Sequence, residues 1–455
     1  MAYPFQKNRK HLCVNSLITT ISESYEQIPD VRPNKDPRKI TIHDASMSAF
    51  AMMHLKYPSL LSFERDKTEQ EVRHNLEHLY QIKKRAPCDT SMREILDPID
   101  PAEFKKPFKT LLSNVQRGGL LKAFEFHCGN LKNHYLLPID GTGLFYSCNN
   151  KKPCQECCTK NKGKANEAHY HQLMAACIAH PDQKTVLPLA PEAIVRQDGS
   201  TKNDCEKNAI KRLFATIREH HPRLKLVILL DSLYADNPTI QLIKSYGWHY
   251  IIVAKDGNHA SLIEAMDELD KEGKVNRVEK FNEETGIKWW FRYANGVRLN
   301  KAKYAEKVNV LDFVETDKKG KQHIWCWVTD IPLNDETIEP VMKGGRCRWH
   351  IENQTFNTLK NQGYDLEHNY GHGEKHLATN LAYLTMLAFL VDQIQELCCP
   401  QFQEALRTRS KGVRIALWKW IQGYFLHWLI KTWEGLFYTV IHGIEEKRVI
   451  PFDTS

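Results

Sequence analysis

Three acidic residues of this 455-residue chain, Asp140, Asp231 and Glu352, lie at the ends of predicted strands or within a predicted helix, where the fold would fix their positions. Asp140 directly follows the apolar run 135–139, and Asp231 directly follows the apolar run 224–230. Strands that are apolar along their whole length are usually covered on both faces of a sheet. We therefore expect each Asp at the end of a buried strand, and Glu352 is the third acidic residue of the group.

The chemistry that such a set can perform is metal-assisted. Glu352 lies within the run 346–360, which reads as a helix. Carboxylates that hold two divalent cations about 4 Å apart let one ion activate water while the other stabilises the leaving oxygen. Oxygen ligands of this kind suit two magnesium or manganese ions. Any single acidic strand end is also explained by a solvated turn or a helix cap, but Asp140, Asp231 and Glu352 in this order favour a metal site.

The neighbours of Glu352 suggest contacts with a phosphate backbone. Arg348 lies one helical turn before Glu352 on the same face, where it can contact phosphate or orient the Glu. A polar stripe on the adjacent face is a candidate track for a DNA backbone, and its alternative is an ordinary solvated face. The stripe consists of Asn353, Asn357, Lys360 and Tyr364.

The pattern of apolar segments predicts the fold class. Three strands (135–147, 169–179 and 184–194) precede a helix (203–220), a strand (224–230), a second helix (238–246) and a further strand (250–254). The order β-β-β-α-β-α-β is that of an RNase-H-like sheet, in which the first and fourth strands are neighbours. We therefore predict an α/β fold with a mixed sheet flanked by helices, in which Asp140 lies beside Asp231.

The rest of the chain divides around this core. We predict a helical region over 1–130, the first part of the core over 131–256, a β-rich insertion over 257–332, the second part of the core with the Glu352 helix over 333–397, and a helical region over 398–455. The last region is rich in aromatic residues, which at helical spacing are more typical of packing between helices than of a stacking surface.

A group of cysteines in the loop after the first strand forms a second candidate metal site. Cys154 and Cys157 have the spacing of a zinc knuckle, and Cys158 and His171 can complete four soft ligands. Cys148 and His169 lie close by in the sequence, so the ligand set is not unique. The alternative is a group of reduced thiols. A zinc here would be structural and would pin a loop beside Asp140.

Composition sets the cellular context. The chain carries 63 Lys and Arg against 55 Asp and Glu, a net charge of +8, which permits a polyanionic partner without requiring one. No run of about 18 uncharged apolar residues occurs, so we expect no membrane association. Residues 1–13 do not resemble a signal peptide, which favours a cytoplasmic, nucleoid-associated protein.

Residues 135–390 resemble the DDE transposases of bacterial insertion sequences. The stretch 348–364, continuing to 367–373, is similar to the terminal-Glu signature of one subgroup, and Asp140-Gly141-Thr142 and 231–234 are similar to its two Asp motifs. The broader Tyr-Arg-Glu-Lys signature is kept in part. Gly345 stands where the Tyr is expected, and Leu359 stands where the Lys is expected, one residue before Lys360.

The resemblance implies a function and partners. It implies an RNase-H-like core with a β-rich insertion, hydrolysis at the 3′ ends of an insertion sequence, and attack of the freed 3′-OH on target DNA. The expected partners are double-stranded DNA, meaning the terminal inverted repeats and the target, bound by a homodimer with its N-terminal region on the DNA ends. The rivals are an RNase-H-like nuclease or resolvase without strand transfer, and a non-cutting DNA-binding protein derived from a transposase.

Overall fold

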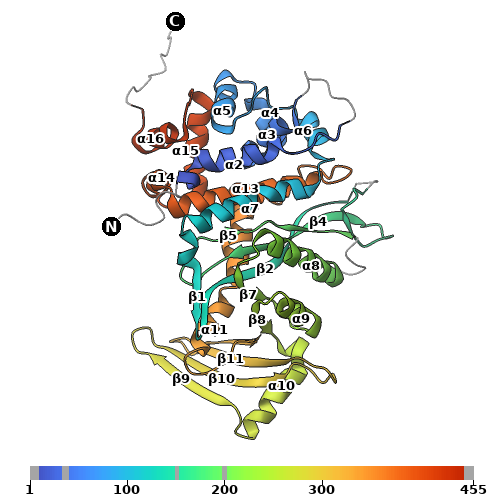
Figure 1. Cartoon of the computed structure of the whole chain (residues 1–455), viewed down its shortest axis with the longest axis vertical. Coiled ribbons are helices and arrows are strands. Elements are labelled where there is room, and N and C mark those ends of the chain that lie inside the picture. The colour runs from blue at the N-terminus through green and yellow to red at the C-terminus, as the bar shows by residue number, and fades with distance from the viewer. Residues whose placement is uncertain (1–9, 33–39, 149–152, 197–201, 445–455) are drawn as a thin grey trace. The chain divides into compact units, whose positions relative to one another are not determined.

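The computed structural model describes residues 10–32, 40–148, 153–196 and 202–444 (Figure 1). The sequence interpretation of the N-terminus concerns residues 1–13, of which 1–9 lie outside this range. The chain forms two compact units. Unit 1 comprises Met1–Gly118 and Leu359–Ser455, and unit 2 comprises Gly119–Thr358. The borders of the five predicted regions remain predictions, and each unit is described by itself.

The described residues of unit 2 form one sheet of twelve strands. The central order is β3-β4-β2-β7-β8-β12-β11-β10-β9, with β1 on β2 and with β5 and β6 on β4. The strands are β1 (Glu125–Cys128), β2 (Leu131–Ser147), β3 (Cys158–Lys160), β4 (Ala168–Ile178), β5 (Leu187–Pro188), β6 (Glu192–Ile194), β7 (Lys225–Leu230), β8 (His249–Ala254), β9 (Asn276–Asn282), β10 (Ile287–Arg298), β11 (Lys307–Thr316) and β12 (Gln322–Thr329). The short segment η2 (Leu120–Phe124) precedes β1.

The centre of this sheet has the RNase-H-like arrangement that the sequence predicts. Strand β4 pairs antiparallel with β2, and β2, β7 and β8 are parallel neighbours. Helix α8 (Lys202–His220) leads into β7, and η4 (Ser232–Tyr234) and α9 (Asn237–Ser245) connect β7 to β8. Because parallel neighbours need a crossover connection, the helices between these strands follow from the strand order. The predicted fold class is confirmed.

The predicted β-rich insertion extends the same sheet. Strand β12 pairs antiparallel with β8, and β11, β10 and β9 follow in order (Figure 1). The prediction missed α10 (Asp256–Lys271), which begins the insertion. Only Leu262 and Met266 of this helix are fully buried, so its apolar periodicity is weak. Arg292 of β10 holds it, with its guanidinium 2.7 Å from Asp267 and 2.7 Å from Asp312 of β11.

The segment predicted as one helix over 346–360 is divided. Helix α11 (Ile338–Arg346) ends before the π-helical segment η5 (Ile351–Phe356), and α12 (Asn357–Asn361) follows. A π-helical turn inside a helical run widens the backbone and is frequent at functional sites. The π-helical segment that interrupts the predicted helix therefore contains Glu352.

Unit 1 is helical. Its elements are η1 (Lys10–Leu12), α2 (Val14–Glu26), α3 (Ile42–His54), α4 (Leu60–Asp66), α5 (Gln70–Tyr80), α6 (Asp89–Leu96), α7 (Pro101–Arg117), α13 (Leu377–Cys398), α14 (Pro400–Ser410), α15 (Arg414–His427) and α16 (Trp433–His442). Helix α13 is long and apolar enough to cross a membrane, but its apolar window is entirely buried among the other helices of unit 1. Trp418 and Trp433 are also buried, as expected for packing between helices.

The core of unit 1 contains a buried charged group around Asp392 of α13. Its carboxylate lies 2.8 Å from Lys56 Nζ and 3.2 Å from His54 Nε2, and it accepts a hydrogen bond from the Tyr364 hydroxyl. The rings of Tyr364 and Trp418 lie 4.0 and 4.1 Å from the Lys56 ammonium. Burial acts to raise the pKa of Asp392, but the charge of Lys56 and the contact with His54 outweigh it and lower the pKa to about 2. Asp392 is therefore ionised and pairs with the Lys56 ammonium, whereas burial lowers the pKa of the neighbouring His54.

We predict that Asp392→Asn lowers the free energy of unfolding by about 3–5 kcal/mol at pH 7, because it leaves a buried ammonium without its counter-charge. The lowered pKa means that the stabilisation is complete above about pH 4 and is lost as pH falls toward 2. Denaturant unfolding of both proteins should therefore show a difference that narrows below pH 4.

Glu396→Gln is the matched control, because Glu396 lies on the same helix and its partner Arg414 is 2.5 Å away, but the pair is only partly buried. We expect this variant to lose about 1 kcal/mol or less. An equal loss in both variants would contradict a special role for Asp392.

Candidate active site

The parallel pairing of β2 with β7 brings the two predicted aspartates together. Pro138 of β2 pairs with Leu229 of β7. Two residues further along each strand are Asp140 and Asp231. Neighbouring strands lie about 4.8 Å apart, so this register places the two Asp backbones side by side at the same edge of the sheet. The predicted neighbourhood of the two residues agrees with this register.

Local backbone contacts orient each of these carboxylates. Asp140 Oδ1 accepts a hydrogen bond of 2.8 Å from the N–H of Gly141. Asp231 Oδ1 accepts one of 3.0 Å from the N–H of Leu233, in the cap of η4. In each residue one oxygen is thereby fixed by the chain that follows the strand, so the turn residues set the direction of the carboxylate.

Arg348 joins Glu352 to Asp140. Its Nη2 lies 2.7 Å from Glu352 Oε1, and its Nη1 lies 3.3 Å from Asp140 Oδ2. The Arg348 side chain is only 11% exposed, whereas the Asp140 and Glu352 side chains are 28% and 37% exposed. A guanidinium can donate two hydrogen bonds in a fixed fork. The Arg348 fork therefore holds a carboxylate from the sheet and one from η5 at a set separation.

The segment that carries Glu352 is fixed onto the sheet beside Asp140. Ile351 and Thr355 are fully buried, and the Thr355 hydroxyl lies 3.5 Å from Cys177 Sγ of β4. His350 Nε2 lies 3.0 Å from the carbonyl oxygen of Gln183, in the turn after β4. These contacts hold the segment in place and leave Glu352 on its partly exposed side. The position of Glu352 is therefore set by the packing of its neighbours in the chain.

The site is crowded with negative charge. Burial, and less strongly the charges of Asp231 and Glu352, raise the pKa of Asp140 to about 6, although the Gly141 N–H and Arg348 act to lower it. The positive charge around Asp140 therefore does not offset its burial and the charges of its acidic neighbours. The donors here are carboxylate oxygens, which are the ligands that magnesium and manganese prefer. Asp140, Asp231 and Glu352 therefore fit divalent cations.

The predicted DNA-contacting residues fall in different environments. Asn353 and Asn357 are exposed, which fits a solvent-facing stripe. Lys360 is partly exposed, and its ammonium lies 2.7 Å from Glu367 Oε1. Tyr364 is buried in unit 1 and donates to Asp392, so the structure does not place it on the exposed stripe. Its hydroxyl satisfies a core carboxylate, which spacing along a helix does not reveal.

One residue near the aspartates, Glu206, has no signal in the sequence. Glu206 of α8 lies beside Gly141, where a Cβ added to the glycine would meet Glu206 Oε1 at 3.5 Å. The pKa of the buried Tyr234 is raised by burial and then by the charges of Glu206, Asp231 and Asp140. Glu206 stands among the mostly polar and charged residues 202–208, so the sequence alone suggests that it is part of an ordinary solvated helix face.

Asp236 follows Asp231 closely in the sequence but has another role. Its Oδ1 accepts from the N–H of Thr239 at 2.9 Å, which caps α9, and its Oδ2 lies 2.5 Å from Lys207 Nζ. Its carboxylate is thus occupied by a helix cap and a lysine. Asp231 is the residue that the strand register places beside Asp140.

The structure explains why a glycine stands where the resemblance leads one to expect a Tyr. A Cβ added to Gly345 would lie 2.5 Å from the indole of Trp327, which is buried in β12. No real Cβ approaches another atom so closely, so a side chain at this position requires Trp327 to move.

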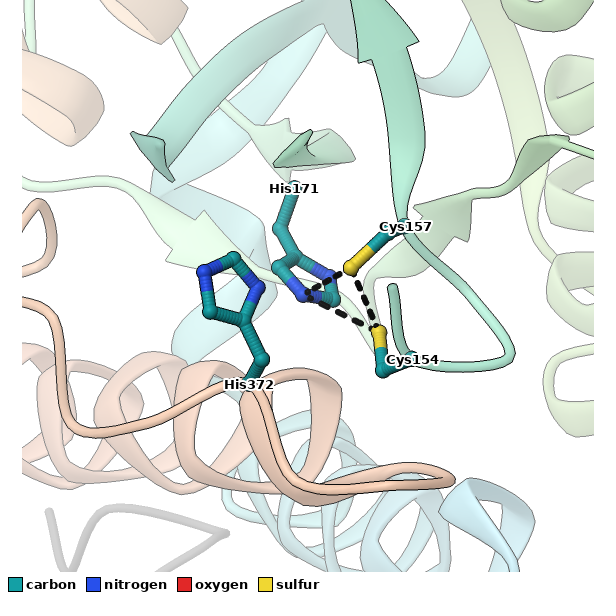
Figure 2. A group of neighbouring side chains, drawn as sticks. All are labelled: Cys154, Cys157, His171 and His372. Carbon is teal, nitrogen blue, oxygen red and sulfur yellow. Dashed lines mark hydrogen bonds between the residues drawn. The ribbon is translucent and has the colours of Figure 1, made fainter. Parts of the chain in front are cut away.

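The predicted cysteine cluster is formed in part (Figure 2). Cys154 Sγ and Cys157 Sγ lie 2.7 Å apart, and His171 Nε2 lies 3.4 and 3.5 Å from them. Cys158 does not join this trio, because its thiol donates to the carbonyl oxygen of Ile194 at 3.7 Å. Figure 2 also draws His372, a residue of unit 1.

Comparisons with known proteins identify a family. The family model described as the transposase DDE domain matches residues 136–390, more than half of the chain. No curated protein matches the chain. Among solved structures, a cryo-EM structure of the piggyBac transposase synaptic complex with hairpin DNA is similar at 10% identity and a TM-score of 0.39, over 96% of this chain and 80% of that one. A similarity this low carries no functional argument.

We predict that Arg348→Ala lowers the melting temperature in metal-free buffer, because Asp140 and Glu352 lose the guanidinium that they share. The corresponding loss in the free energy of unfolding is about 1–2 kcal/mol. Added magnesium should then raise the melting temperature of this variant more than that of the wild type, since a divalent cation can replace the missing charge. Thermal unfolding with and without magnesium measures both effects.

Arg346→Ala is the control, because Arg346 precedes the same segment and lies 3.0 Å from Glu315, away from the three carboxylates. Magnesium should stabilise this variant no more than it stabilises the wild type. A magnesium effect of the same size in all three proteins would show that Arg348 does not compensate the acidic group.

Proposed function

Because the chain belongs to the family of the transposase DDE domain, we propose that it is the DNA transposase of an insertion sequence. The proposed activity is hydrolysis at the 3′ ends of the element, followed by strand transfer into target DNA. The observation that carries the proposal is the group of three carboxylates at one edge of the sheet, two of which, Asp140 and Glu352, are bridged by Arg348. Of the three, two come from parallel strands and one from a packed helical segment.

Both proposed steps are in-line phosphoryl transfers. In the first, a water oxygen bonds to phosphorus and the bond to the 3′ oxygen breaks, which leaves a 3′-OH on the element. In the second, that 3′-OH bonds to a target phosphorus and displaces a target 3′ oxygen. Two bound divalent cations would supply activation of the attacking oxygen and stabilisation of the leaving oxygen.

The residues of the chain position these reactants. Asp140, Asp231 and Glu352 would hold the cations, and the backbone N–H groups of Gly141 and Leu233 fix the direction of the two aspartates. Arg348 holds Asp140 and Glu352 together and would neutralise phosphate charge once the carboxylates bind cations. A pre-positioned set of this kind reduces the reorganisation that each step requires.

The partners follow from the activity. The substrates would be double-stranded DNA with terminal inverted repeats and a target duplex, with a homodimer on the paired ends. The net charge of +8 supports binding to a polyanion, and the exposed Asn353 and Asn357 next to Glu352 offer side-chain contacts to a backbone. We further propose a cytoplasmic location at the nucleoid, where the DNA is found.

We predict that Asp140→Asn, Asp231→Asn and Glu352→Gln each reduce end cleavage by at least about a thousandfold, because each removes a charge that the cations require. DNA binding should change less than about threefold, since phosphate contacts remain. Cleavage and gel-shift assays on a duplex that carries the element end give both values.

Asp236→Asn is the matched control, because Asn also caps a helix and the residue lies only five positions beyond Asp231. It should cleave within a few fold of the wild type. If Asp236→Asn were inactive and Asp231→Asn active, the second carboxylate would be misassigned.

A further prediction separates a transposase from its rivals. Given an end with a preformed 3′-OH and a supercoiled target plasmid, the wild type should join the two, and Glu352→Gln should not. Cleavage without joined products would favour a nuclease or resolvase. Tight binding with neither product, under magnesium or manganese, would favour a DNA-binding protein that no longer cuts.

A further inference from the structure

We propose that Cys154, Cys157 and His171 bind a structural zinc ion in unit 2, separate from the three carboxylates. The two cysteines lie in the segment that leads into β3, and His171 lies on β4 (Figure 2). All three side chains are buried, and their ligand atoms lie within 4.8 Å of one another. This inference does not depend on the proposed transposition activity.

The distances favour a metal site over a disulfide. For Zn–S bonds of about 2.3 Å and Zn–N bonds of about 2.05 Å, tetrahedral geometry requires S···N separations of about 3.6 Å. His171 Nε2 lies 3.4 Å from Cys154 Sγ and 3.5 Å from Cys157 Sγ, close to this value. The two sulfurs, 2.7 Å apart, need to separate by about 1 Å. A disulfide would give no reason for a histidine nitrogen almost equidistant from both sulfurs.

The types of ligand select the metal. Two thiolates and one imidazole are soft and borderline donors, which suit zinc and not magnesium. Cys154, Cys157 and His171 fill three positions of a tetrahedron, and a donor outside this trio or a water fills the fourth. Burial of the three side chains excludes most solvent, which is typical of a structural ion.

The zinc would act where the hydrogen-bond ladder of the sheet is interrupted. The β2–β4 pairing is regular from Ile139 to Gly143 and shifts register before Tyr146. His171 lies on β4 beside this irregularity, and its ring lies 5.3 Å from that of Phe145 in the bulged part of β2. A bulge leaves residues without ladder partners. Ligation of His171 to Cys154 and Cys157 would fix the strands at that point.

The same strand connects the zinc site to the candidate active site. Ala175 of β4 pairs with Asp140 of β2, and His171 lies four residues earlier on β4. An even separation keeps the side chains of 171 and 175 on one face, about 13 Å apart. A metal that fixes β4 at His171 would thereby support the register in which Asp140 is presented.

The test is metal analysis of the full chain purified without chelator, which should contain about one zinc per chain. Cys154→Ser and Cys157→Ser should each fall below about 0.2 zinc per chain. Cys158→Ser is the matched control, because this adjacent buried thiol donates to Ile194 and should leave the zinc in place. Asp140→Asn should also retain zinc, which separates this site from the carboxylates.

Two measurements on the wild type keep the proposal testable if the serine variants are insoluble. Replacement of the ion by cobalt should give thiolate-to-metal charge-transfer bands and the visible bands of a tetrahedral ion. Removal of zinc by a chelator should lower the melting temperature and expose two thiols to alkylation, with restoration by added zinc. Less than about 0.2 zinc per wild-type chain, or an intact mass two daltons low that shows a Cys154–Cys157 disulfide, would overturn the proposal.

Discussion

The parallel pairing of β2 with β7 is the constraint on which the candidate site depends. Parallel neighbours end at the same edge of a sheet, so an acidic residue at the end of each strand must meet the other. Burial raises the pKa of Asp140 to about 6, and repulsion from Asp231 contributes. Because the fold holds these carboxylates together despite their repulsion, a cation that binds between them is held strongly.

The remaining contacts keep this unfavourable arrangement from relaxing. Arg348 offsets part of the repulsion, but one guanidinium opposes three carboxylates. The backbone N–H groups of Gly141 and Leu233 prevent the aspartates from rotating away. Burial of Ile351 and Thr355 holds the Glu352 segment against the sheet. Apolar packing and backbone contacts therefore fix the positions of the three carboxylates, while their negative charges attract cations.

The sequence predicts those parts of the structure that leave a periodic or terminal signal. Continuous apolar strands that each end in Asp give the positions of Asp140 and Asp231 and their neighbourhood. Helix α10 was missed because it buries only two residues fully and its charged residues dominate the pattern. The spacing of Tyr364 along a helix fits an exposed stripe, but its hydroxyl is used inside unit 1 by Asp392. Whether a polar side chain such as Tyr364 is exposed or buried depends on partners that are distant in the sequence.

Two carboxylates of this chain show how neighbouring charges distinguish an acidic group that is compensated inside the protein from one that is not. Both Asp392 and Asp140 are penalised by burial, and they differ in what surrounds them. Asp392 has Lys56, His54 and Tyr364 as partners, and its pKa falls to about 2. Asp140 shares one guanidinium with Glu352 and faces two more carboxylates, and its pKa rises to about 6. A carboxylate whose charge is fully compensated inside the protein needs no further partner. One that remains under-compensated at the edge of a sheet retains free energy for a cation from solution, which is the property that a site for metal-assisted chemistry requires.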